Sequence, residues 1–346
     1  MRNSQLKKRI GKEKRPEVVV ITGASAGIGR ATAQRFARDG AKVGLLARGL
    51  EGLEGARRDV EMLGGEALAI PTDVSSAEQV ETAASKIEER LGPIDIWINN
   101  AMVSVFSPVK EMQAEEYRRV TEVAYLGYVY GTLSAVKRML PRDRGTVVQV
   151  GSALAFRGIP LQSSYCGAKH AIQGFTESLR TELLHDHSNV WVTMVHLPAS
   201  NTPQFNWVKS RLPRKPQPYP PVFQPEVPAE AIYYAAHHRR REMFVGWPTL
   251  KTVIGNRLVP GYVDRVLANT AYEGQQYNGL VELDRQDNLW QPVPRDLGAH
   301  GDFDEGAKSS SWLLWADIHQ KPITLGISAI TIAGLLIFKA ISKGKF

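Results

Sequence analysis

The stretch VVVITGASAGIGR, residues 18–30, joins an apolar β-branched run directly to a glycine-rich segment. The run predicts a buried β-strand over residues 18–22, and the pattern after it predicts a helix. Gly23, Gly27 and Gly29 are spaced so that the backbone turns sharply, approaches a pyrophosphate and opens a helix whose amide groups face the anion. Such turns also arise for packing alone, but the position between a strand and a helix favours a phosphate-binding turn.

The alternation of short β-branched runs with longer helical patterns continues along the chain and predicts βαβ units around a parallel sheet. Strands are expected at residues 18–22, 42–47, 67–71, 94–99, 146–150, 190–197 and 242–246. Helices are expected near residues 27–39, 50–63, 76–91, 114–140 and 163–185. The expected fold is therefore α/β, a doubly wound parallel-sheet Rossmann fold in a single domain, followed by a C-terminal apolar helix.

The composition excludes several classes of protein. The chain has 346 residues, of which 43% are hydrophobic and 23% charged, as in a globular protein with a substantial core. The single cysteine, Cys166, excludes an internal disulfide framework. The net charge of +8 is concentrated partly in residues 1–15, a basic tail that either is solvated or contacts a membrane or an acidic partner. No aromatic-interleaved basic patch accompanies it, so no nucleic-acid partner is expected, and no metal site is expected either.

The run ITLGISAITIAGLLIF, residues 323–338, is apolar on all faces and is followed by lysines. At about 1.5 Å per residue it spans less than the ~30 Å core of a bilayer, so shallow insertion or snorkelling lysines would have to accompany it. A membrane anchor is favoured; a helix packed on this protein or a partner, and a peripheral helix, stay open. The expected location is a membrane, with the catalytic domain facing the cytoplasm.

The expected organisation has four parts. Residues 1–15 form the basic tail, and residues 16–285 form the Rossmann domain, within which the proline-rich segment 203–228 forms a substrate lid. Residues 286–311 form a polar linker, and residues 312–346 form the apolar C-terminal helix. The lid carries Phe205, Trp207, Tyr219 and Phe223, which indicate an apolar substrate or only the packing of a long loop.

Three motifs together resemble those of the short-chain dehydrogenase/reductase family, over roughly residues 16–246. TGASAGIG, residues 22–29, resembles the family's glycine signature, and NNA, residues 99–101, resembles its fourth-strand motif. SSYCGAK, residues 163–169, resembles its YxxxK motif, with Ser152 at the family's usual distance before Tyr165. The resemblance implies an NADP(H)- or NAD(H)-dependent oxidoreductase whose catalytic residues are Ser152, Tyr165 and Lys169.

The resemblance also implies a set of cofactor-binding residues. Asp73 matches the acid that contacts the adenine ring, although it precedes a helix and is otherwise an N-cap region residue. Asn99 matches a residue on the adenosine side of the pocket, and Thr202 matches one that contacts the nicotinamide amide. The complete set is Thr22, Gly23, Ser25, Gly27, Ile28, Gly29, Arg48, Asp73, Val74, Asn99, Tyr165, Lys169 and Thr202.

The end of the second strand indicates which coenzyme is used. An acidic residue there would bind the ribose 2′-hydroxyl and exclude a 2′-phosphate, but this chain has Ala47 and Arg48. A guanidinium suits a phosphate, so NADP(H) is favoured over NAD(H). Arg30, in the following helix, either adds charge or faces solvent.

The Tyr165–Lys169 spacing has a chemical reason. A tyrosine ordinarily titrates near pH ~10, and a lysine one helical turn away favours the phenolate and is expected to lower that pKa. In the expected mechanism Ser152 binds the substrate carbonyl and Tyr165 protonates its oxygen as hydride arrives. Lys169 tunes Tyr165 and holds the nicotinamide ribose.

Three positions depart from the family's pattern. Ala124 stands where the family has an asparagine that binds a water linking the lysine to solvent. Two alternatives stay open: Thr121, Glu122 or Tyr125 orders that water instead, or the proton relay is slower. Met102 and Ala199 replace two usual glycines. An alternative therefore stays open, a membrane-tethered NADP(H)-binding sensor or scaffold. The favoured function is a carbonyl reductase or secondary-alcohol dehydrogenase for a lipophilic substrate, assembled as a homodimer or homotetramer, as the resemblance implies.

Overall fold

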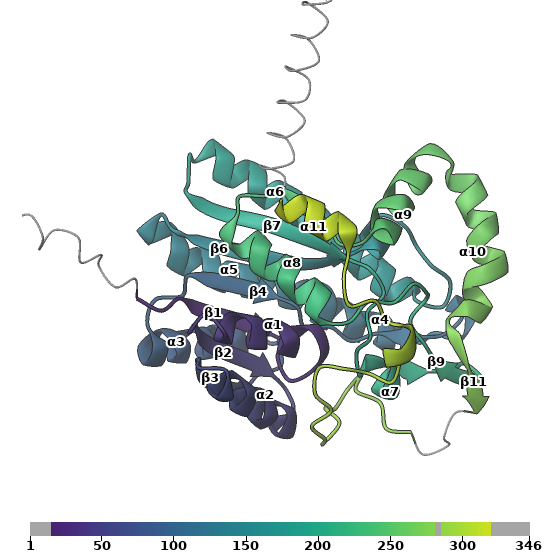
Figure 1. Cartoon of the computed structure of the whole chain (residues 1–346), viewed down its shortest axis with the longest axis horizontal. Coiled ribbons are helices and arrows are strands. Elements are labelled where there is room, and N and C mark those ends of the chain that lie inside the picture. The colour runs from purple at the N-terminus through teal and green to yellow at the C-terminus, as the bar shows by residue number, and fades with distance from the viewer. Residues whose placement is uncertain (1–14, 281–284, 320–346) are drawn as a thin grey trace, which may run out of the picture.

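Strand β1 (Val18–Thr22) lies inside a seven-stranded sheet and is buried along its whole length. The computed structural model describes residues 15–280 and 285–319 (Figure 1). The sheet has the order β10-β7-β6-β4-β1-β2-β3, and all its neighbouring strands are parallel. The other six strands are β2 (Lys42–Ala47), β3 (Glu66–Pro71), β4 (Ile96–Asn99), β6 (Gly145–Ser152), β7 (Val190–Leu197) and β10 (Glu242–Phe244). The predicted α/β Rossmann fold is confirmed.

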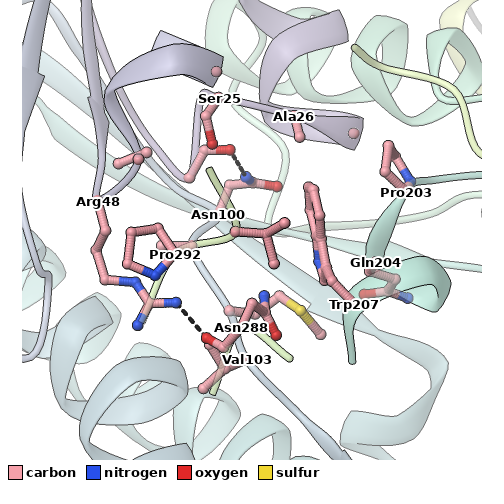
Figure 2. Close-up of a pocket in the computed structure, with 18 of the residues that line it drawn as sticks. Ser25, Ala26, Arg48, Asn100, Val103, Pro203, Gln204, Trp207, Asn288 and Pro292 are labelled. Carbon is pink, nitrogen blue, oxygen red and sulfur yellow. Dashed lines mark hydrogen bonds between the residues drawn. The ribbon is translucent and has the colours of Figure 1, made fainter. Parts of the chain in front are cut away.

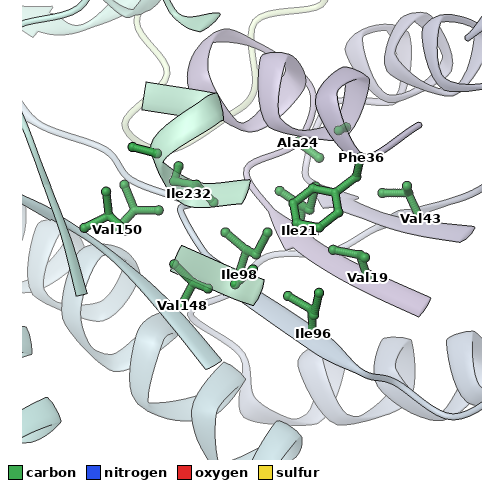
Figure 3. Close-up of a cluster of buried hydrophobic side chains, with 14 of the residues drawn as sticks. Val19, Ile21, Ala24, Phe36, Val43, Ile96, Ile98, Val148, Val150 and Ile232 are labelled. Carbon is green, nitrogen blue, oxygen red and sulfur yellow. The ribbon is translucent and has the colours of Figure 1, made fainter. Parts of the chain in front are cut away.

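Helices cover both faces of the sheet because side chains alternate along each strand. Val19 and Ile21 point to the face covered by α1 (Gly27–Ala37), α2 (Leu50–Met62) and α8 (Glu226–His237), and Figure 3 shows this core around Phe36 and Ile232. Val18 and Val20 point to the opposite face, which α3 (Ala77–Leu91), α5 (Gly127–Met139) and α6 (Ser163–His185) cover. Strands buried on both faces explain the continuous apolar runs in the sequence.

The order of the strands places the ligand-binding crevice. The chain moves outward from β1 through β2 and β3, and then continues on the other side of β1 with β4. In such sheets ligands bind beyond the carboxyl ends of the strands at this point of reversal. The glycine-rich segment after β1 and Asn100, directly after β4, both lie there.

The helix expected over residues 114–140 is interrupted. Helix α4 (Ala114–Thr121) passes into a single π-helical turn (Glu122–Leu126) before α5 begins at Gly127. A π-turn inserts one extra residue and changes the direction in which later side chains project. Ala124 lies inside this turn.

The lid has its own secondary structure. It contains α7 (Gln204–Trp207) and two short strands, β8 (Lys209–Ser210), which pairs with β5 (Val105–Phe106), and β9 (Arg214–Pro216), which pairs with β11 (Gln276–Leu280). Helices α9 (Trp247–Leu258) and α10 (Pro260–Gly274) follow the sheet and form a hairpin beside it (Figure 1). The sequence did not predict this hairpin, because only Thr249 of α9 and Ala271 of α10 are buried and no strong apolar stripe marks it.

The segment expected as a polar linker packs on the domain. Leu289 is buried in the core cluster that contains Val20 and Trp97 of the sheet, and Phe303 contacts the lid residue Phe205. A short helix, α11 (Trp312–Ile318), follows. Within residues 15–280 and 285–319, no helix is long and apolar enough to cross a membrane. The basic tail up to residue 14 and the apolar run 323–338 lie outside the described residues.

Candidate active site

The glycine turn after β1 leaves no room for side chains. Gly23 and Gly27 have positive φ angles of +67° and +57°, which favour glycine. A Cβ on Gly29 would lie 2.2 Å from the carbonyl oxygen of Gly23, so α1 packs directly on the turn. Helix α1 begins at Gly27 with no side-chain cap and no acidic residue in its first turn. Its N-terminus therefore offers amide groups and a positive dipole end to an anion.

Two predicted binding residues lie behind the turn and not in the pocket. The Thr22 hydroxyl is buried and accepts hydrogen bonds from the amides of Asn100 (2.9 Å) and Ala101 (3.1 Å). Asn99 is fully buried and bonds Trp97, Thr132 and Gln149. Asn100 lines the pocket instead of Asn99, because side chains alternate at the end of β4 and the first asparagine turns into the core.

The first pocket lies beyond β1 and β2 and contains the remaining residues predicted for the adenosine and pyrophosphate groups. Gly23, Ser25, Gly27, Ile28, Arg48, Asp73, Val74 and Thr202 all line it, whereas Gly29 packs beneath it. The Asp73 carboxylate accepts hydrogen bonds from Arg119 (2.7 Å) and Ser75 (2.8 Å), which, together with the charge of Arg119, hold its pKa below the ordinary value despite burial. Asp73 therefore carries a negative charge at the edge of this pocket.

Arg48 also lines this pocket, and its charge is not paired with a carboxylate in any hydrogen bond of the described structure. Its guanidinium donates to the main-chain carbonyl of Asn288, as Figure 2 shows, and to those of Leu289 and Trp290, the last at 3.0 Å. Burial, and then the nearby Arg119, lower the pKa of Arg48. The side chain is thus a partly desolvated cation held in place by neutral acceptors.

The C-terminal strap, residues 286–300, closes the outer side of the first pocket. Asn288, Pro292, Val293 and Arg295 line the pocket opposite the glycine turn, and Trp207 joins them from the lid (Figure 2). The strap is tied to the domain mainly by main-chain atoms, including the Gly298 carbonyl, which accepts from the Gly27 amide at 3.1 Å. Contacts made by main-chain atoms leave no pattern in the side chains, which is why the sequence of this segment predicted a linker. Arg30, for which the sequence left added charge at the pocket or exposure to solvent open, is buried and forms ion pairs with Asp59 and the strap residue Asp296.

A second pocket, of about 250 Å³, adjoins the first at the carboxyl ends of β6 and β7. Ser152, Tyr165 and Lys169 all line it, so the structure brings the predicted catalytic residues together. The two pockets share five lining residues, Ile28, Asn100, Met102, Thr202 and Gln204. They therefore form one continuous cleft, with the glycine turn at one end and the tyrosine at the other.

The interactions of the three predicted residues differ from the sequence-based expectation. Burial raises the pKa of the Tyr165 phenol above its ordinary value, and the nearby Ser152 hydroxyl, which lowers that pKa, offsets only part of the effect. Lys169 is 2% exposed, and burial lowers the pKa of its ammonium to about 7. Its Nζ lies 5.5 Å from the centre of the Tyr165 ring. The expected net lowering of the Tyr165 pKa is therefore wrong for this structure, because burial raises that pKa; the effect of Lys169 on the phenolate stays a prediction.

The rest of the second pocket is mostly apolar. Phe106, Leu154, Ile159, Leu197, Phe205 and Leu267 line it, together with Pro218, Tyr219, Pro220 and Pro221 of the lid. Of the four lid aromatics, Phe205 and Tyr219 face this pocket, Trp207 faces the first pocket and Phe223 is buried in the main core. Packing therefore accounts for Phe223, while for the other three aromatics contact with a substrate and packing both stay open.

The sequence is similar to known oxidoreductases along most of its length. A family model described as "short chain dehydrogenase" matches residues 17–211, more than half of the chain. An uncharacterized oxidoreductase of Bacillus subtilis, YxnA, is 33% identical over 338 residues, covering 96% of this chain and 92% of its own. A fatty acyl-CoA reductase of Acinetobacter baylyi is 29% identical and covers 70% of this chain and 80% of its own.

A solved structure has the same fold. An alcohol dehydrogenase from the archaeon Thermococcus sibiricus, complexed with 5-hydroxy-NADP, superimposes with a TM-score of 0.57 at 27% identity. The match covers 66% of this chain and 95% of that one. Given the parallel sheet, the glycine turn after β1 and these similarities, the chain belongs to the short-chain dehydrogenase family of oxidoreductases.

Proposed function

We propose that the protein is an NADP(H)-dependent oxidoreductase that interconverts a carbonyl and a secondary alcohol on a lipophilic substrate. The observation that carries the proposal is the continuous cleft, in which Ser152, Tyr165 and Lys169 line an apolar pocket next to the glycine turn. The chain's own residues fit a nicotinamide dinucleotide: Gly23 and Gly27 provide a cradle that a Cβ would fill, and Arg48 supplies a cation.

Tyr165 is the proton donor in the reductive direction. A bound nicotinamide coenzyme would supply the hydride. Because burial raises its pKa, Tyr165 is protonated at neutral pH and donates its phenolic proton to the carbonyl oxygen. Ser152 donates a hydrogen bond to the same oxygen, and the Lys169 ammonium stabilises the phenolate that forms. In the oxidative direction the phenolate takes the proton from the alcohol.

The apolar lining supports a lipophilic substrate. The parts of the substrate away from the carbonyl would contact four apolar residues, Phe106, Ile159, Phe205 and Leu267. These side chains would exclude water, and burial of apolar surface would favour binding. One relative carries the name fatty acyl-CoA reductase, which agrees with a lipid-like substrate class. The compounds to test first are therefore aliphatic ketones, which would give secondary alcohols, with aldehydes of the same length, which would give primary alcohols, tested beside them.

Turnover of such compounds tests the proposal. The native chain, supplied with NADPH, is expected to reduce members of a panel of aliphatic aldehydes and ketones of increasing length, with kcat/KM rising with apolar length. The measurement is the decrease in NADPH absorbance, with reactions that lack the protein as the blank. Tight binding of NADPH without turnover of any compound would contradict it and favour a coenzyme-binding sensor or scaffold.

Arg48 supports the preference for NADP(H). It lies at the end of β2, where the ribose of the coenzyme is bound in this fold, and its guanidinium is bonded only to neutral carbonyls among the described residues. Arg295 of the strap, which the sequence analysis missed, adds a second and exposed cation to the same pocket. The NADP-complexed alcohol dehydrogenase of Thermococcus sibiricus gives further support.

Replacing Arg48 by alanine is expected to lower kcat/KM for NADPH by about ten- to a hundredfold, because a hydrogen bond between the guanidinium and the 2′-phosphate would be lost. The value of kcat/KM for NADH should change much less, because NADH has no 2′-phosphate. The measurement is the ratio of the two kcat/KM values in the native chain and the variant. Arg48 also anchors the strap, and loss of that anchor would weaken both coenzymes equally. An unchanged ratio would therefore contradict the role of Arg48 in selecting NADP(H).

We also propose that the protein associates with membranes, with the catalytic domain on the cytosolic side. The sequence of residues 323–338 supports this. Within the described part, the α9–α10 hairpin exposes apolar side chains, Leu258 and Tyr262 among them, near the cations Lys251 and Arg257. Exposed apolar residues beside lysine and arginine are typical of surfaces that meet anionic lipid.

The full-length chain is therefore expected to float with vesicles that contain anionic phospholipid, and to do so less in high salt. Leu258→Glu combined with Tyr262→Glu should weaken flotation, because two new carboxylates oppose burial in lipid and are repelled by anionic headgroups. Met62→Glu, at an exposed position on α2, serves as the matched control. Full-length protein that stays in the soluble fraction at every lipid composition would contradict the proposal.

The homo-oligomer remains a proposal as well. Leu133 of α5 and Leu184 of α6 are exposed on two long helices that cover the same face of the sheet. Light scattering during size-exclusion chromatography distinguishes a dimer or tetramer from a monomer.

A further inference from the structure

The Lys169 ammonium is enclosed by α5 and β6. Nζ donates to the Tyr128 hydroxyl at 2.9 Å and to the Val150 carbonyl at 2.7 Å. The Tyr128 hydroxyl donates to the same carbonyl at 3.1 Å, and Nζ lies 4.6 Å from the centre of the Tyr128 ring. Tyr128 is 1% exposed, so these three groups form a buried set of hydrogen bonds.

Tyr128 is hydrogen-bonded to Lys169, a contact that the sequence did not predict. Ala124 has no polar atom in its side chain. Thr121 donates back to the carbonyl of Tyr117 at 2.8 Å, and the described hydrogen bonds of Lys169 go to Tyr128 and Val150. The ordering of a water by Thr121, Glu122 or Tyr125 stays a prediction. The π-helical turn lies directly before α5, where its extra residue changes the phase at which Tyr128 projects.

We propose that Tyr128 is a positioning residue that holds the Lys169 ammonium in place and keeps it charged in its buried site. This inference rests on the proposed function, in which Lys169 acts on Tyr165. The phenol oxygen accepts one of the three ammonium protons, Val150 accepts the second, and the third is left for Tyr165 or a bound coenzyme. The ring face adds a cation–π attraction.

The environment of Lys169 explains why such a residue is needed. Burial is the cause of its lowered pKa, and no carboxylate offsets it. The titratable groups that face Nζ are Tyr128 from α5 and Tyr165 from α6, while β6 contributes the Val150 carbonyl. An acceptor bonded to the charged form raises a pKa, so Tyr128 opposes the effect of burial. The Tyr128 hydroxyl donates its own proton to the Val150 carbonyl, which has no proton to pass on. Tyr128 therefore positions the ammonium and does not relay protons to solvent.

Tyr128→Phe tests the inference, because it removes the hydroxyl and keeps the ring. The titration of Lys169, followed by NMR in the full chain labelled with ¹³C at lysine Cε, should shift to lower pH by about one to two units. The charged form exists below its pKa, so the fall in kcat with rising pH should begin lower by the same amount, and kcat at neutral pH should drop about tenfold or more. Tyr130→Phe, on the same helix, is the control and should change neither value.

The two readouts separate the possible failures. A titration and a pH profile that both stay as in the native chain, alongside native turnover, would overturn the role of Tyr128 and leave the proposed function standing. If the titration of Lys169 shifts in Tyr128→Phe but the native chain also shows no turnover, the positioning role of Tyr128 is supported and the proposed function is contradicted. Tyr128→Met fills a similar volume without the hydroxyl and gives the same test if the phenylalanine variant fails to fold.

Discussion

Tyr165→Phe is expected to lower kcat for carbonyl reduction by about a thousandfold, while the Kd for NADPH stays within about threefold of the native value. Phenylalanine keeps the ring in the pocket wall but removes the proton donor. Ser152 still faces the carbonyl oxygen, so a small residual rate should remain. The measurement is single-turnover NADPH oxidation together with a fluorescence titration of coenzyme binding.

Tyr272→Phe, at an exposed position on α10, makes the same chemical change outside the cleft and should retain native kcat. A Tyr165→Phe variant with more than about a tenth of the native kcat would show that another group donates the proton. Equal losses in kcat and in NADPH binding would instead indicate a disrupted pocket.

Gly29→Ala is expected to weaken NADPH binding by about a hundredfold and to lower the free energy of unfolding by about 1–3 kcal/mol, as overpacking does. The new Cβ would lie 2.2 Å from the Gly23 carbonyl oxygen and 2.6 Å from Asn100 Nδ2. The Asn100 amide ties the turn to β4, with bonds of 3.0 Å to the Thr22 carbonyl and 3.2 Å to the Gly23 carbonyl. The turn must therefore move away from α1, and the phosphate-binding amides move with it.

Gly174→Ala is the matched control for Gly29→Ala. Gly174 is exposed on α6, and a Cβ there meets nothing within 4 Å, so the change should stabilise the helix by up to about 1 kcal/mol and leave NADPH binding unchanged. Calorimetry of coenzyme binding and denaturant unfolding measure both effects. Native affinity in Gly29→Ala would contradict the assignment of this turn to the coenzyme.

The sheet and the glycine turn were predictable because their signals are local. A strand buried on both faces needs a continuous apolar run, as residues 18–22 have, and a positive φ favours glycine, as at Gly23. Ser152, Tyr165 and Lys169 were found because their spacing resembles a family's motif. The structure then brings all three to one pocket.

Other features depend on contacts that leave no local signal. The strap is held largely through its main-chain carbonyls, at Leu289 and Gly298 for example, so its side chains look like those of a linker. Asn99 and Asn100 are adjacent and chemically identical, and only the pleat of β4 decides which one faces the pocket. Tyr128 lies 41 residues from Lys169, and the π-turn that sets its direction has no evident sequence signature. The pKa of Tyr165 depends on burial, which the Tyr165–Lys169 spacing does not report.

Transfer of deuterium from NADPH labelled at C4 of the nicotinamide tests the central claim most directly. The native chain is incubated with the labelled coenzyme and a panel of aliphatic aldehydes and ketones, and the alcohols formed are examined by mass spectrometry. The proposed function predicts one deuterium on the carbon that was the carbonyl carbon, and labelled alcohol formed about a thousandfold more slowly with Tyr165→Phe. Bound NADPH with no labelled alcohol from any compound would contradict a carbonyl reductase of this substrate class.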